Sequence, residues 1–127
     1  MIGKFPDELK EALLETMQVE FTVIDANDKI VGWNKPKTRV FQRKEEIIGN
    51  DVRECHPKEK LDKVNMLLEG MKAGKVDKMG YWSEFGTEKK KIWVEYRALR
   101  NKEGRYIGCV ETNLELEEAE KTQVQNP

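Results

Sequence analysis

The order of strand-like and helical segments between Glu20 and Glu118 is the feature that most constrains how this chain can fold. Two short apolar runs, Phe21–Asp25 and Ile30–Asn34, flank the turn-rich Ala26–Lys29, and this spacing predicts a β-hairpin. Short mixed segments follow, then a longer helical segment and three more strand-like runs. The order predicts an α+β domain, with a five-stranded antiparallel sheet and helices on one face. The predicted strands lie near 20–25, 30–34, 78–86, 90–100 and 105–115, and the long helix near 57–72.

Helical signals also precede the first strand. Apolar residues recur there at helical spacing, and Asp7 is placed to cap the helix that they form. We expect this helix to pack on the sheet or on a partner chain. Because the small helices cover only one face of the sheet, Trp82 and Trp93 are candidates for the other face. The apolar residues of the helix are Leu9, Leu13, Leu14 and Met17.

Further helices are predicted between and after the strands. Two short ones are expected at Thr38–Gln42 and Glu45–Gly49, the second ended by a glycine that tolerates a left-handed conformation. Pro57 suits the first position of the long helix, where its missing amide is not needed. A polar helix is expected over Glu115–Gln125. The apolar stripe of the long helix consists of Leu61, Val64, Leu68 and Met71.

Composition and charge exclude several classes of partner. The 127 residues suit one domain, and 23 basic against 24 acidic side chains give a net charge of −1. This balance offers no electrostatic reason for binding nucleic acid or an anionic membrane. No apolar run approaches the roughly 20 residues that span a bilayer, and no secretory signal is visible. The two cysteines, Cys55 and Cys109, lie far apart, which favours a reducing cytoplasm over a disulfide-stapled fold.

Several short motifs occur in the order and spacing of a known family. Over residues 19–118 the chain resembles a PAS domain, and it is similar to the C-terminal PAS module of proteins that carry a hemerythrin-like region. The resemblance implies a PAS fold and a cytoplasmic sensory or signal-relay module that is not an enzyme. It divides the chain into a flanking helix (1–18), a PAS sensor domain (19–118) and a polar tail (119–127). The matching motifs are Val23-Ile-Asp25, Asn34, Ile47-Ile-Gly49, Cys55-His-Pro57 and Glu103-Gly-Arg-Tyr-Ile-Gly108.

The resemblance also implies a cofactor. In heme-binding PAS domains the iron ligand is typically a histidine on or near the long helix, and His56 is the only histidine of this chain. A thioether from Met71 or Met79 is then expected at the sixth position, for gas or redox sensing. Read structurally, His56 caps the helix or hydrogen-bonds a loop carbonyl. Val64, Leu68 and Tyr96 complete the expected pocket lining.

Other functions stay open at this stage. The pocket between the long helix and the sheet also suits a small metabolite, and the domain also suits cofactor-free dimerisation or partner contact. No acid, base and nucleophile set indicates an enzyme, and adjacent Cys55 and His56 point to opposite sides of an extended segment. We expect a homodimer whose interface includes residues 5–17. At Asn113-Leu114-Glu115 the wider family often carries Asp-Ile-Thr, so the signal-transmitting junction differs here.

Overall fold

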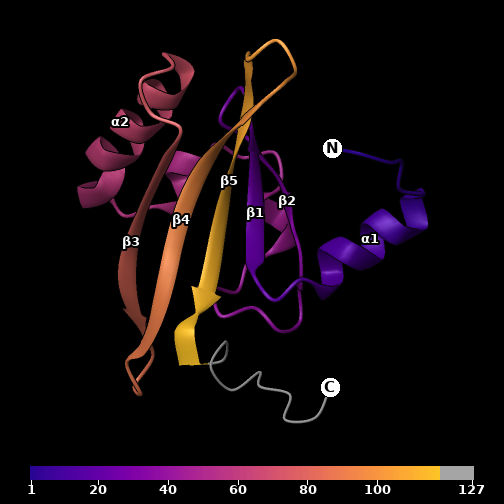
Figure 1. The fold of residues 1–127 in the computed structure, drawn as a ribbon. Coiled ribbons are helices and arrows are strands. Elements are labelled where there is room, and N and C mark those ends of the chain that lie inside the picture. Colours follow the sequence, from indigo (N-terminus) through magenta and orange to yellow (C-terminus); the bar gives the residue numbers. More distant parts are fainter. Residues whose placement is uncertain (118–127) are drawn as a thin grey trace.

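The computed structural model describes residues 1–117 of the chain (Figure 1). The expected 119–127 tail and all but the start of the helix expected over Glu115–Gln125 lie outside the described residues. Ten elements follow one another, of which η1 to η3 are short 3-10 helices. They are α1 (Asp7–Thr16), β1 (Glu20–Asp25), β2 (Ile30–Trp33), η1 (Glu45–Ile47), η2 (Val52–Cys55), η3 (Lys58–Lys60), α2 (Leu61–Lys72), β3 (Lys78–Phe85), β4 (Lys90–Arg100) and β5 (Tyr106–Glu115).

Within the described residues the five strands form one antiparallel sheet in the order β2-β1-β5-β4-β3, which confirms the predicted α+β fold. The first and last strands are central neighbours, with Phe21 opposite Thr112. Gly108 of β5 lies so close to β1 that a side chain there would meet the carbonyl oxygen of Ile24. The first and last strands of the sheet domain therefore pack closely side by side.

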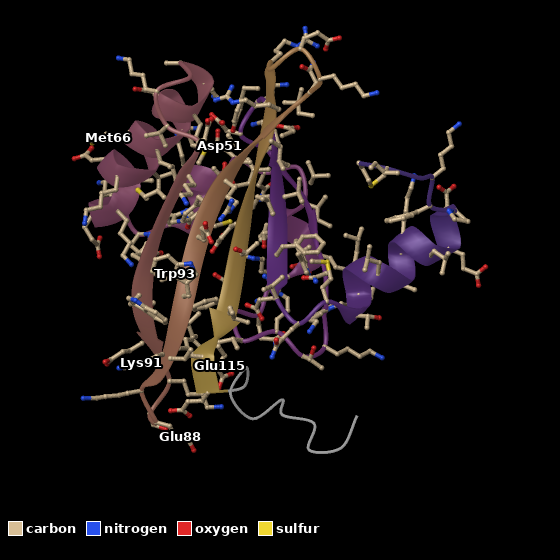
Figure 2. The ribbon with its side chains drawn as sticks, in the orientation of Figure 1. Asp51, Met66, Glu88, Lys91, Trp93 and Glu115 are labelled. Carbon is tan, nitrogen blue, oxygen red and sulfur yellow. The ribbon has the colours of Figure 1, made fainter. Side chains whose placement is uncertain are left out.

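The two faces of the sheet differ as the alternation of β4 predicts. Ile92, Val94 and Tyr96 are buried on the face toward α2, which we call the inner face. Trp93 points to the opposite, outer face, where Figure 2 labels it on β4. Trp82 lies directly across from Trp93 on β3, and the two rings meet edge to face at 5.1 Å. Both tryptophans therefore lie on the outer face, as expected.

The core lies between the inner face and the segment from η2 to α2. Leu68 and Met71 of the predicted stripe are buried, whereas Leu61 and Val64 are half-buried. Met66 is on the side of α2 away from the sheet (Figure 2). Cys109 is fully buried in this core. The core residues are Ile24, Ile30, Val52, Leu67, Leu68, Met71, Ile92, Val94, Tyr96 and Cys109.

The helix predicted at Thr38–Gln42 is absent, and a side chain from β1 explains why. The carboxylate of Glu20 accepts the backbone amides of Val40 at 2.7 Å and Phe41 at 3.2 Å. These amides are therefore satisfied without helical hydrogen bonds. Arg39 supports the same extended path by donating from Nη1 to the carbonyl of Asn34 at 2.9 Å.

Two helix starts also differ from expectation. Asp7 is the first residue of α1 and not its cap, because Pro6 takes the flanking position and no side chain caps the helix. Pro57 is extended, with ψ of 150°, and α2 begins only at Leu61, after η3. A proline restricts the residue before it to extended conformations, which separates η2 from the helical turns that follow. Gly49 does adopt the left-handed conformation expected of it, with φ of 88°.

The first helix does not cover the sheet of its own chain. Figure 1 shows α1 beside the β2 edge, with its C-terminal end near the sheet and its N-terminus pointing away. None of its residues is buried, and Leu9, Leu13 and Leu14 are all exposed. The apolar side of α1 therefore has no cover within residues 1–117.

Candidate functional site

A cavity of about 720 Å³ lies between α2 and the inner face of the sheet. Cavities of roughly 300–1,000 Å³ hold drug-sized ligands. The cavity brings together five of the six residues expected to form a site, His56, Val64, Leu68, Met79 and Tyr96. Met71 is not among its lining residues. It is fully buried in the core, and its carbonyl accepts a 2.6 Å hydrogen bond from Nη2 of Arg100.

The backbone of η2 holds the ring of His56. Its Nδ1 lies 2.9 Å from the carbonyl oxygen of Val52, four residues earlier. Since a carbonyl only accepts, Nδ1 carries the proton, and Nε2 of the neutral ring keeps its lone pair. The structure thus shows the loop-carbonyl hydrogen bond that the structural interpretation anticipated. The same bond fixes the tautomer that a metal ligand needs.

A second, more polar space of about 420 Å³ adjoins the first. The two share His56, Lys60, Tyr81, Ser83 and Tyr96 in their linings, so they form neighbouring parts of one site. We call the second space the polar end. Its charged side chains are Arg43, from the loop after β2, Glu111, from β5, and the exposed Lys60, at the end of η3.

Arg43 and Glu111 form a largely buried ion pair. Nη2 of Arg43 donates to Oε2 of Glu111 at 3.1 Å, with side-chain exposures of 16% and 10%. Nε of Arg43 also donates to Oγ1 of Thr22 at 2.9 Å. Charged side chains with this little exposure need a close partner of opposite charge, and each of these two supplies it to the other.

The pair continues into a buried polar network beneath β1. Oγ1 of Thr22 also accepts from Nη2 of Arg39 at 3.2 Å, and Arg39 lies 3.8 Å from Oε1 of Glu20. Burial lowers the pKa of Arg39, an effect that the nearby Glu20 partly offsets. Nδ2 of Asn113 donates to Oε1 of Glu20 at 3.3 Å. The inner face near β1 and β5 is therefore hydrogen-bonded, whereas the part near α2 is apolar.

Two tyrosine hydroxyls separate the apolar and polar ends of the site. Tyr81 of β3 and Tyr96 of β4 are diagonal neighbours on the inner face of the sheet. Burial raises the pKa of Tyr96 well above its usual range, and the charge of Glu111 raises it further. Tyr96 therefore remains neutral and able to donate at any physiological pH.

Cys55 is exposed, and its surroundings do not activate its thiol. Partial burial of the thiol raises its pKa, so the thiolate form is disfavoured. The Nδ1 atom of neighbouring His56 is occupied by the carbonyl of Val52.

Among residues 1–117 no group of three His, Cys, Asp or Glu side chains is placed to hold a metal ion. In the same part of the chain no helix is long and apolar enough to cross a membrane.

The polar end is the part of the site that the sequence analysis missed. A signal for it was present, because Glu111 lies two residues from both Cys109 and Asn113 and so shares their inward face of β5. A charged residue at an inward position of a strand indicates a paired or functional group. Arg43 gave no such signal, since nothing in its loop sequence identifies its partner across the fold.

Comparison with known proteins supports the fold. The sequence profile described as PAS domain matches residues 11–117. A C-terminal domain from Streptococcus mutans is similar in structure, with a TM-score of 0.80 and 25% identity over 95% of this chain and 96% of that one. The PAS domain of BvgS from Bordetella pertussis has a TM-score of 0.63 and 13% identity, over 90% and 91% of the two chains.

A sensory box sensor histidine kinase from Vibrio cholerae shares the same fold. Its TM-score is 0.59 at 16% identity, and the match covers 86% of this chain and 90% of that one. No curated protein sequence is matched by this chain. At these identities the Bordetella and Vibrio structures support the fold alone.

Proposed function

The chain belongs to the PAS domain family, and we propose that it senses a small-molecule ligand bound between α2 and the inner face of the sheet. The observation that carries this proposal is the cavity of about 720 Å³, which is lined by apolar side chains of α2 and by the imidazole of His56. An apolar cavity with a few convergent polar groups is the usual form of a ligand site. Ligand binding there would bias the sheet and the helices attached to it. The module is proposed to work in the cytoplasm.

Heme held by His56 is the specific ligand that we propose to test first. The residues fit this group in one respect, because the bond between Nδ1 of His56 and the carbonyl of Val52 selects the tautomer whose Nε2 lone pair is free to bind iron. Of the two expected thioethers, Met79 lines the same cavity as His56, whereas Met71 is packed in the core. Bound heme would supply an iron centre that responds to gases or redox state. We therefore assign any sixth-ligand role to Met79.

Visible absorption spectroscopy on the full chain tests the heme proposal. Heme addition should give a sharp Soret band, and His56→Ala should abolish the six-coordinate spectrum, because the sequence contains no other imidazole. Met79→Leu should yield a five-coordinate ferrous spectrum, whereas Met71→Leu should not. An unchanged spectrum in His56→Ala would remove His56 as the ligand.

A small organic metabolite is the second ligand that we propose, and the polar end favours it. Heme ligation by His56 gives no role to the buried pair of Arg43 and Glu111, which lines the adjoining space. A metabolite with a polar end and an apolar body would contact both parts of the site. The two ligands are distinguished by the Soret band.

We also propose that the domain is a homodimer. The apolar residues Leu9 and Leu13 of α1 are exposed, and so is Trp82 on the outer face of the sheet. A symmetric pair would cover such surfaces with the same surfaces of a second copy. Dimerisation or partner contact without any ligand remains the alternative function, and it predicts no ligand response.

A further inference from the structure

The polar end of the cavity has a composition that restricts the chemistry of the ligand. Arg43 and Glu111 both line it, and their side chains are 16% and 10% exposed. They are joined by one hydrogen bond, between Nη2 and Oε2. A ligand that enters this space therefore meets a donor and an acceptor side by side.

Both residues retain unused hydrogen-bonding capacity. Arg43 donates from Nε to Thr22 and from Nη2 to Glu111, while Glu111 accepts at Oε2. Among the hydrogen bonds of residues 1–117, none uses Nη1 of Arg43 or Oε1 of Glu111. Charged groups with little exposure need partners for their remaining positions, and water or a ligand supplies them. These two atoms offer one set of N–H donors and one oxygen acceptor.

The charges of the pair cancel, and the third charged side chain of the polar end, Lys60, is exposed, so water screens its charge. The buried pair therefore disfavours a charged ligand. A carboxylate next to Arg43 would also approach the carboxylate of Glu111, and an ammonium next to Glu111 would approach the guanidinium. In each case the repulsion offsets the attraction at a site with little water to screen it. An uncharged group with one acceptor and one donor meets both partners without repulsion.

We infer that the polar end recognises an uncharged ligand group that accepts from Arg43 and donates to Glu111, such as a carboxamide or a lactam. The apolar body of that ligand lies against Val64, Leu67 and Leu68 of α2, in the adjoining space of about 720 Å³. The neutral hydroxyls of Tyr81 and Tyr96 lie between the two parts. The inference rests on the proposed ligand-binding function and applies to ligands other than heme.

Three probes with one apolar body test this selectivity. They are 4-hexylbenzamide, 4-hexylbenzoate and hexylbenzene, each titrated into the full chain by calorimetry. We expect the amide to bind about tenfold or more tightly than either other probe, since hydrogen bonds to charged groups are among the stronger ones. The matched variant is Glu111→Gln, which keeps the size of the side chain but removes its charge. In that variant benzoate affinity should rise about tenfold, because Arg43 is no longer neutralised.

A control variant and the remaining outcomes complete the test. Glu95→Gln makes the same change on the outer face of β4 and should leave all three affinities unchanged. The inference is overturned if benzoate binds the native chain as tightly as the amide, or if Glu111→Gln leaves the ratio unchanged. If hexylbenzene binds in those cases, the cavity is still a ligand site and only the selectivity of the polar end is refuted. If none of the three probes binds, the ligand-binding proposal fails as well.

Discussion

Asn34, after β2, donates a 2.8 Å hydrogen bond from Nδ2 to the backbone carbonyl of Leu14 in the last turn of α1. The same amide group donates to the carbonyl of Val19 at 3.1 Å and accepts the backbone amide of Phe21 at 2.7 Å. Asn34 is 1% exposed, so water does not compete for these bonds. One buried side chain therefore joins α1, the linker after it and β1.

Replacing Asn34 should destabilise the domain strongly. Asn34→Ala removes three buried hydrogen bonds and leaves backbone groups without partners, which should lower the free energy of unfolding by about 3 kcal/mol. Asn27→Ala, in the exposed turn after β1, is the control and should change it by less than about 0.5 kcal/mol. Urea denaturation measures both. Equal stability of the two variants would show that Asn34 does not join these segments.

Removing the hydroxyl of Tyr106 should be harmless. This hydroxyl is buried and makes no hydrogen bond within the described residues. Tyr106→Phe should therefore change the free energy of unfolding by less than about 0.5 kcal/mol or raise it, because an unpaired buried polar group is removed. Tyr96→Phe removes a hydroxyl that, unlike that of Tyr106, interacts with a neighbouring side chain, Tyr81, and should lower it by about 1 kcal/mol. Thermal unfolding measures both variants. A larger loss of stability in Tyr106→Phe than in Tyr96→Phe would contradict an unpaired Tyr106 hydroxyl.

Stability should fall at alkaline pH because Cys109 is buried as a neutral thiol. Burial raises the pKa of Cys109 from its ordinary value of 9.0 to about 12. Below pH 9 both states are protonated and this contribution is complete. Between pH 9 and about 12 only the unfolded state ionises, so stability is lost as pH rises.

Cys109→Ala separates this effect from other titrations. The variant will be less stable overall, but its free energy of unfolding should fall less steeply from pH 9 to 11. The difference in slope should approach about 1.4 kcal/mol per pH unit, the value for one proton. Tyr106, whose pKa burial raises to about 12 with a smaller contribution from Cys109, titrates in both proteins. Parallel slopes would mean that Cys109 ionises in the folded state.

The proposed dimer should depend on the apolar side of α1. Leu9→Glu with Leu13→Glu places charge on that side and should convert the dimer to a monomer at micromolar concentration in light scattering. Substitution is preferable to deletion of residues 1–18, because deletion would remove the carbonyl of Leu14 that Asn34 needs. Lys10→Gln, a change of one charge unit at an exposed position of the same helix, is the control. A native chain that is already monomeric would refute the dimer.

The sequence predicted those features that depend on local periodicity. The alternation around Val94 and the apolar stripe around Leu68 correctly indicate which faces are buried. The path of Thr38–Gln42 could not be predicted, because its amides are satisfied by Glu20, twenty residues away. Contacts between distant segments override local helix preference there.

In the site, too, local features could be predicted from the sequence and long-range contacts could not. His56 was recognised because it is the only histidine, and its hydrogen bond to Val52 spans only four residues. The pairing of Arg43 with Glu111 spans 68 residues and depends on β5 lying between β1 and β4. Met71 and Met79 were equivalent in the sequence, and only the packing of α2 on the sheet separates them.

We propose that a ligand occupies the cavity between α2 and the sheet, and amide chemical shifts report on binding there residue by residue. In the full chain, 4-hexylbenzamide should shift amides along α2 and β3, and Val64→Trp, which fills the cavity, should abolish these shifts. Shifts confined to the groove between α1 and β2, lined by Leu14 and Val31, would contradict the claim. So would shifts along α2 that persist unchanged in Val64→Trp.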